Sequence, residues 1–259
     1  MDHKNLNIYI SRKDVKNMRA RENHKTLVTL NNIAKISKYK INETREMMEY
    51  YKNITLDNMT NSEIYAEICW IVYSSGFRYD IIKKYWNLIE KELYYFDINK
   101  VASFIDDVDE YSHRICKNSG FNNVKKAQWC IKNAVRFIEL DHEKINYGGL
   151  KGYLLELSKK EPYELIEMAP LLIEELKLNG IGKITIFHLM KNIGINIFKP
   201  DIHVRRILLN LGLISKENSS IKEIYYIMKD VSEKMQIDLV ELDTLLFSYG
   251  RIFGDEIVF

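Results

Sequence analysis

The sequence predicts an all-helical protein. Apolar residues recur every three or four positions along most of the chain, and no segment shows the alternation of a half-buried strand that would rival this pattern. Proline and glycine are scarce, with 3 and 11 among 259 residues, while leucine, isoleucine, lysine and glutamate are common. The hydrophobic share of 46% is enough to build a core in one large domain or two small ones.

Net charge and cysteine usage limit the functions that the chain can have. The net charge is only +2, so any surface for nucleic acid must be local. Cys69, Cys116 and Cys130 lack the C-x-x-C spacing of metal and iron–sulfur sites, so we expect reduced core thiols and no metal. The N-terminal residues lack an apolar signal segment, and no stretch is long enough to span a membrane. We therefore expect a cytoplasmic protein with no membrane partner.

The first part of the chain, residues 1–57, is polar and mildly basic. We expect an accessory segment there, formed by solvated helices or, as the second alternative, by helices that contact a nucleic-acid backbone. Its basic residues are Arg12, Lys13, Lys16, Arg19, Arg21, Lys25, Lys35, Lys38 and Lys40.

Helical periodicity is strong from residue 58 onward. Thr60 and Glu63 have the spacing of a capping box, which predicts a helix that ends at Gly76. The glycines at 148, 149 and 152 predict a loop. Further helices are predicted from residue 80 to 89, after 97, and over 124–140, 162–176, 184–192, 202–211, 221–235 and 239–249.

A two-glycine turn separates two of these helices, in the segment Leu178-Asn179-Gly180-Ile181-Gly182-Lys183. The first glycine permits the left-handed conformation that ends a helix, and the second lets the backbone approach a ligand closely. Exposed amides at the start of the next helix form an anion site that suits a phosphate. Lys183 would add a charge and Thr185 a hydroxyl. A plain connection between helices is the alternative.

A single carboxylate follows one helix later. Pro200 stops the preceding helix, and Asp201 occupies the N-cap position of the next one, a role worth about 1 kcal/mol. The same carboxylate is suited to stabilise a cationic sugar or to orient water beside a nucleotide. His203 is a packing residue, a phosphate contact or a general base. Arg205 and Arg206 face different ways on a helix, so one of them meets nucleic acid or an acid.

These two segments together resemble the helix-hairpin-helix (HhH-GPD) DNA glycosylase superfamily. The turn is similar to its L-P-G-(I/V)-G hairpin, with Asn179 in place of proline. The stretch from Asp201 to Ile207 is similar to its D-(T)-H-V-x-R-(V/I) segment, with Ile202 in place of threonine. Upstream, Gly120 to Ala127 resembles the G-x-x-x-x-K-A helix start of the family.

The resemblance covers about residues 58–259 and implies a two-lobed helical fold with a cleft between the lobes. We expect one lobe over about 58–140, a hairpin lobe over about 160–215, and C-terminal helices that return to the cleft. The implied partner is duplex DNA that contains a damaged base, and this base would be flipped into the cleft. We expect the enzyme to be a monomer and, in a prokaryote, to be associated with the nucleoid. Asp201 is the implied catalytic residue. The implied DNA-backbone contacts are Asn179, Gly180, Ile181, Gly182, Lys183, Thr185, His203 and Arg205, aided by a monovalent cation on the hairpin carbonyls and by no other cofactor.

One departure from the family pattern indicates the subclass. Bifunctional members place a nucleophilic lysine two residues after the second hairpin glycine, where this chain has Ile184. Lys183 is one residue early and on a helix points about 100° away. The resemblance therefore implies a monofunctional enzyme that uses water. The chain also lacks the C-terminal cysteine cluster of the iron–sulfur branch.

The first lobe has a weaker resemblance to 3-methyladenine DNA glycosylase I, through residues 68–79 and 96–102. The pocket glutamate of that family corresponds to Ile71, and its pocket aromatic residue corresponds to Tyr79. The resemblance favours an alkylated purine such as 3-methyladenine, since cationic purines stack well on aromatic rings. The candidates for the base pocket or for a wedge in the duplex are Trp70, Tyr73, Phe77, Arg78 and Tyr79. Each aromatic residue has a place in the core as its alternative.

Three other functions are compatible with the sequence. One is a glycosylase for oxidised purines, uracil or mismatches, including a lyase that uses Lys183. Another is a non-catalytic DNA-binding protein that keeps only the hairpin. The third is a helical interaction protein without DNA binding.

Overall fold

The computed structural model describes residues 12–254, and the side chains of residues 25–254. Helices connected by short loops make up this range, and no strand occurs within it, which confirms the all-helical prediction. The expected basic side chains at Arg12, Lys13, Lys16, Arg19 and Arg21 lie outside the described side chains.

Thirteen α-helices are present in the described range. They are α1 (Arg12–Lys40), α2 (Asn42–Asn53), α3 (Asn61–Ser74), α4 (Tyr79–Glu92), α5 (Ile98–Ala102), α6 (Val108–Ser119), α7 (Val124–Glu143), α8 (Leu150–Ser158), α9 (Pro162–Leu176), α10 (Thr185–Asn192), α11 (Ile202–Asn210), α12 (Ile221–Met235) and α13 (Leu239–Phe253). Short 3-10 helices cover Leu56–Asn58, Tyr94–Phe96 and Ile145–Tyr147.

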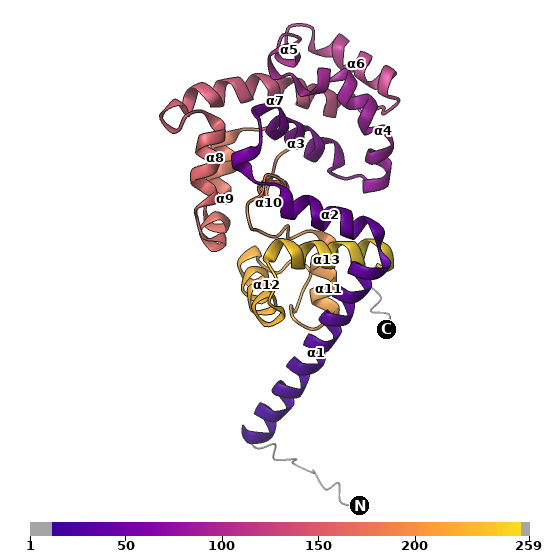
Figure 1. Cartoon of the computed structure of the whole chain (residues 1–259), viewed down its shortest axis with the longest axis vertical. Coiled ribbons are helices and arrows are strands. Elements are labelled where there is room, and N and C mark those ends of the chain that lie inside the picture. Colours follow the sequence, from indigo (N-terminus) through magenta and orange to yellow (C-terminus); the bar gives the residue numbers. More distant parts are fainter. Residues whose placement is uncertain (1–11, 255–259) are drawn as a thin grey trace, which may run out of the picture.

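The helices form two lobes (Figure 1). In the upper lobe, α3, α5 and α6 pack against α7, and α4 packs against α6. In the lower lobe, α1, α2, α11 and α12 all pack against α13. Helices α8, α9 and α10 lie between these two groups in the view of Figure 1. The predicted boundary at residue 57 stays a prediction, although α1 and α2 are part of the lower lobe rather than a separate body.

Local sequence signals set most helix ends. Thr60 and Glu63 form the predicted capping box at the start of α3, and the Asp97 side chain caps α5. The prediction of a loop over the glycines at 148, 149 and 152 is wrong at its C-terminal end, because Gly152 lies inside α8. A Cβ at Gly152 would lie 1.8 Å from the Tyr147 carbonyl oxygen, so glycine is needed there for close packing rather than for a turn.

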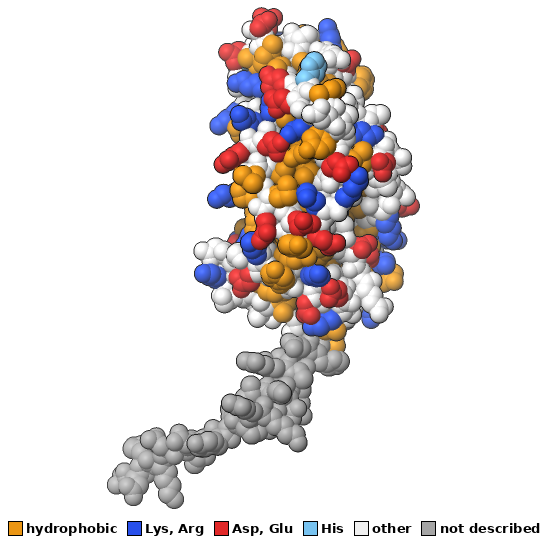
Figure 2. All heavy atoms as spheres, turned by 90° about the vertical axis from the view of Figure 1, so that its left-hand side faces the viewer, with side chains coloured by type: hydrophobic (Ala, Val, Ile, Leu, Met, Phe, Trp, Pro, Cys, Tyr) orange, Lys and Arg blue, Asp and Glu red, His pale blue; other side chains and the backbone are white. Residues whose placement is uncertain are grey.

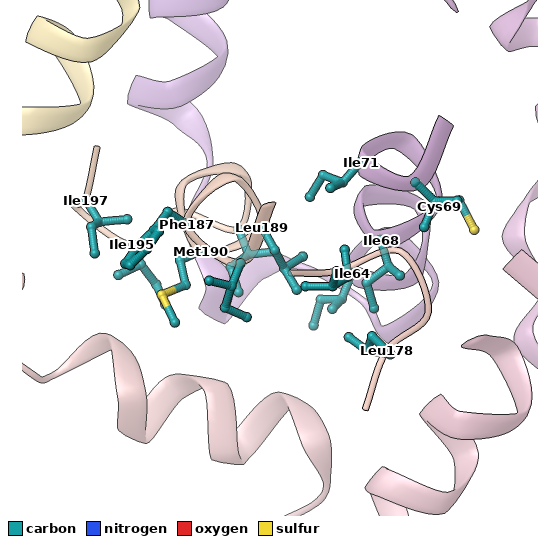
Figure 3. Close-up of a cluster of buried hydrophobic side chains, with 14 of the residues drawn as sticks. Ile64, Ile68, Cys69, Ile71, Leu178, Phe187, Leu189, Met190, Ile195 and Ile197 are labelled. Atoms are coloured by element: carbon teal, nitrogen blue, oxygen red, sulfur yellow. The ribbon is translucent and has the colours of Figure 1, made fainter. Parts of the chain in front are cut away.

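Helices α3 and α10 share a continuous apolar core. Figure 3 shows Ile64, Ile68 and Ile71 of α3 near Leu189 of α10 and near Leu178, which precedes the turn. All five side chains are buried. This packing fixes the two-glycine turn against the upper lobe.

Two sequence expectations concern the core and the surface. Cys69, Cys116 and Cys130 are buried free thiols, as predicted. None of the described helices combines the length and the apolar content that crossing a bilayer requires. On the face shown in Figure 2, basic and acidic side chains are interspersed, and no continuous basic patch covers it.

Candidate active site between the lobes

A cavity of about 680 Å³ lies where the two lobes meet. One wall comes from α3, the Ser74–Phe77 turn and the start of α4. The other walls come from α2, α10, the start of α11 and α13. A volume of this size is typical of sites for small molecules and single nucleotides.

Asp201 lines this cavity from the start of α11. Its Oδ1 accepts hydrogen bonds from the backbone N–H groups of His203 (3.0 Å) and Val204 (3.2 Å), so the predicted N-cap is present. Its Oδ2 lies 3.6 Å from Lys199 Nζ. One oxygen therefore holds the helix end and the other pairs with Lys199, so capping of α11 leaves Oδ2 without a backbone hydrogen bond and the two predicted roles of this carboxylate are compatible.

The hairpin turn is anchored to the upper lobe. Gly180 has a φ of +80°, and a Cβ there would lie 3.0 Å from Trp129 Cε3 and 3.2 Å from Val72 Cγ2. Asn179, at the position where the hairpin that it resembles has proline, donates its backbone N–H to Asn133 Oδ1 (2.7 Å) and accepts at its carbonyl from Asn133 Nδ2 (3.0 Å). Glycine and asparagine at these positions therefore dock the turn on α7.

Two of the predicted phosphate contacts are already used inside the turn. The Gly182 N–H donates to Thr185 Oγ1 (2.6 Å), and the Thr185 hydroxyl faces the carbonyls of Gly180 and Gly182 at 3.4 and 3.3 Å. Ile181 is buried, and Lys183 is exposed outside the cavity walls. The phosphate-binding role of the hairpin stays a prediction, in which Lys183 and the exposed backbone carry more weight than Thr185.

Arg205, another predicted DNA-backbone contact, makes hydrogen bonds within the protein. Its Nε donates to the Pro200 carbonyl (2.8 Å), and its Nη1 donates to the carbonyls of Glu217 (2.9 Å) and Ser219 (2.7 Å). Arg205 therefore ties the loop after α11 to the start of that helix, and its contact with the DNA backbone stays a prediction. Arg206 Nε lies 3.5 Å from Glu217 Oε1, so one of the two arginines contacts an acidic residue, as expected.

Three of the five predicted pocket residues, Trp70, Phe77 and Tyr79, line the cavity, and so does His203. Tyr73 does not, which corrects the prediction: it is fully buried in the upper-lobe core, where its ring contacts Trp86 and Phe121. Arg78 lies outside the cavity walls, with an 81% exposed side chain that pairs with Asp80. Phe77, at 39% exposure, keeps the position expected of a wedge.

A buried ion pair that the sequence did not predict joins the cavity walls. Lys191 of α10 bonds Asp243 Oδ2 of α13 and donates to Thr244 Oγ1 (3.0 Å). Asp243 Oδ1 accepts the backbone N–H of Lys199 (3.3 Å), two residues before Asp201. Burial lowers the pKa of Lys191 and raises that of Asp243, while their mutual attraction opposes both shifts. The pair connects α10, α13 and the loop that carries Asp201.

Further cavity residues also come from helices far apart in the sequence. His188 lies in the wall, and its pKa is held well below the ordinary value by burial and by Lys199 and Lys191. Phe247 contacts the His203 ring edge-on, with centroids 5.5 Å apart. No single segment contains a signal for these neighbours, because their proximity depends on how the lobes pack. Among the described residues, no group of three or more His, Cys, Asp or Glu side chains is arranged to hold a metal ion.

No protein-family model matches the chain, and no curated protein matches it in sequence. Solved structures do match its fold. The 8-oxoguanine DNA glycosylase of Methanocaldococcus jannaschii aligns with a TM-score of 0.58 and 20% identity, over 87% of this chain and 95% of that chain.

Two further solved structures are similar. The 8-oxoguanine glycosylase/lyase of Methanocaldococcus jannaschii, in complex with a 15mer DNA containing 8-oxoguanine, aligns with a TM-score of 0.58 and 18% identity, over 89% and 99% of the two chains. The 8-oxoguanine DNA glycosylase of Thermotoga maritima aligns with a TM-score of 0.57 and 17% identity, over 87% and 96%. These likenesses confirm the predicted helical DNA glycosylase fold.

The two hairpin glycines are expected to differ in their effect on stability. Gly180→Ala places a Cβ against Trp129 and Val72 at a positive φ, and we expect it to lower the free energy of unfolding by about 1–3 kcal/mol. Gly182→Ala is the matched control, since its Cβ would meet nothing within 4 Å. Urea denaturation of both variants measures this difference. Equal stability of the two variants would contradict the docking of the turn through Gly180.

Proposed function

We propose that this protein is a DNA glycosylase that removes a damaged purine from duplex DNA. The single observation that carries the proposal is the position of Asp201, on the wall of an interlobe cavity that also contains the first residues after the hairpin turn. The fold shared with 8-oxoguanine DNA glycosylases supports the same function.

The cavity chemistry is suited to this reaction. A flipped base would stack on the aromatic rings that Trp70, Tyr79 and Phe247 contribute from three helices. Asp201, held by two backbone N–H groups, would stabilise positive charge on the sugar as the N-glycosidic bond breaks, or orient the attacking water. Flipping costs a few kcal/mol of unstacking, and the rim residue Phe77 would fill the gap in the duplex.

We propose that water, rather than a lysine, attacks the sugar. Ile184 occupies the position of the family's nucleophilic lysine, and its side chain lines the cavity. Lys183 is exposed and lies outside the cavity walls, in the turn before α10 rather than on a helix, so the expected helical offset does not apply to it. These positions support a monofunctional enzyme.

The hairpin would hold the DNA backbone beside the cavity. The Gly180 carbonyl accepts one long hydrogen bond of 3.4 Å from Thr185 Oγ1, so its second lone pair would be a ligand for the monovalent cation implied by the resemblance. Such an ion would supply positive charge for a DNA phosphate. We propose that the enzyme acts on duplex DNA as a monomer.

Two classes of purine lesion are candidates for the substrate. The resemblance of the first lobe to 3-methyladenine DNA glycosylase I favours an alkylated purine, and the aromatic walls suit a cationic base. The similar solved structures are 8-oxoguanine glycosylases and favour an oxidised purine instead. We give more weight to the oxidised purine, because that likeness extends over most of the chain.

The role of Asp201 is testable with an isosteric change. Asparagine caps helices as well as aspartate does, so Asp201→Asn should keep the fold while removing the negative charge. We expect base release to fall by about a hundredfold or more, with unchanged affinity for a lesion-containing duplex. Single-turnover excision, scored as alkali-sensitive sites, measures the rate. Full activity of the variant would refute the assignment of Asp201.

Borohydride trapping tests the monofunctional proposal. A Schiff base between a lysine and the sugar would be reduced to a stable protein–DNA adduct, and we expect none while base release proceeds. A bifunctional 8-oxoguanine glycosylase/lyase is the positive control. An adduct that disappears in Lys183→Ala, or in a variant of Lys199 beside Asp201, would show that a lysine attacks the sugar.

A further inference from the structure

Glu67 of α3 is a further carboxyl group in the cavity wall, separate from Asp201 and Asp243. Its Oε1 accepts a hydrogen bond from the Tyr50 hydroxyl of α2 (2.7 Å), and its Oε2 accepts one from Asn192 Nδ2 of α10 (2.7 Å). Three helices therefore fix the position of this side chain. Trp70, three residues later on the same helix, lines the same wall.

Neutral groups alone make these hydrogen bonds. Burial raises the pKa of Glu67, and the groups that act against this shift are the Tyr50 and Asn192 hydrogen bonds rather than a cation. Lys191, the cation of α10, is bonded to Asp243 instead. A largely buried carboxyl group without a cationic partner is costly for stability. Its position in the cavity wall is typical of a group retained for binding.

The hydrogen-bonding capacity of Glu67 is only half used. Each carboxylate oxygen has about two acceptor positions, and each accepts one hydrogen bond within the protein. One acceptor position therefore remains on each oxygen. The Watson–Crick edge of guanine offers two adjacent donors, N1–H and N2–H. That of adenine offers one donor next to the N1 acceptor, which would face a carboxylate lone pair.

We propose that Glu67 reads the flipped base and selects guanine-type lesions, those with two adjacent N–H donors, over adenine-type lesions. The inference rests on the proposed glycosylase function and names the substrate class of its cavity. Trp70 on the same wall supplies stacking, which does not distinguish the bases, while the carboxylate supplies the discrimination. A site built to bond two donors discriminates strongly against a base that lacks one of them.

Glu67→Gln tests this reading through a change of preference. The amide keeps the size of the side chain but offers one acceptor and one donor, the pattern that matches the edge of adenine. We expect kcat/KM for an 8-oxoguanine duplex to fall by about tenfold or more, while kcat/KM for a 3-methyladenine duplex does not fall. Glu63→Gln on the same helix is the control, since glutamine also serves in its capping box.

The outcomes distinguish recognition of the base by Glu67 from a purely structural role of Glu67 in the cavity wall. Binding to a duplex with an abasic-site analogue, which has no base, should be the same for wild type and Glu67→Gln. Equal losses on both lesions, weaker binding to the abasic duplex, or a wild-type preference for the adenine-type lesion would overturn the inference while leaving glycosylase activity intact. A wild-type protein that releases no base from any lesion would refute the proposed function itself.

Discussion

The structure depends on how helix α10 is held between the lobes. In the turn before this helix, the Gly180 backbone lies so close to Trp129 and Val72 that a Cβ would be only 3.0 and 3.2 Å from their side chains. At its end, Lys191 is bonded to Asp243 of α13 inside the protein. Because one contact fixes α10 to the upper lobe and the other to the lower lobe, the cavity has a defined width, and the hairpin is set at a fixed distance from Asp201.

Three of the carboxyl groups that line the cavity have different surroundings and therefore different roles. Asp243 is buried and committed to Lys191, so it serves the structure. Asp201 lines the cavity, with one oxygen held by backbone N–H groups and the other 3.6 Å from Lys199 Nζ, where charge on a sugar would develop. Glu67 is held by neutral donors next to an aromatic wall. Asp243 thus suits a structural role, Asp201 suits catalysis, and Glu67 suits recognition of the base.

Sequence reasoning succeeded where a local signal was sufficient. The periodicity from Pro162 to Leu176 predicted α9 with the bounds that the structure shows, and Pro200 with Asp201 predicted the cap of α11. It failed for Tyr73, because α3 is apolar on nearly every face and periodicity cannot separate its core side from its cavity side. The polar α2 gave no sign of lining a cavity. Glu67 could be recognised only once α2, α3 and α10 were known to meet.

The central claim is that a nucleotide turned out of the duplex enters this cavity with its sugar at Asp201. A crystal structure of the protein with a duplex that contains an abasic-site analogue tests this most directly. The account predicts that the analogue's sugar lies in contact with Oδ2 of Asp201, the oxygen that does not cap α11, with the adjacent phosphate on the hairpin. DNA bound on another face, or a sugar remote from Asp201, would contradict it.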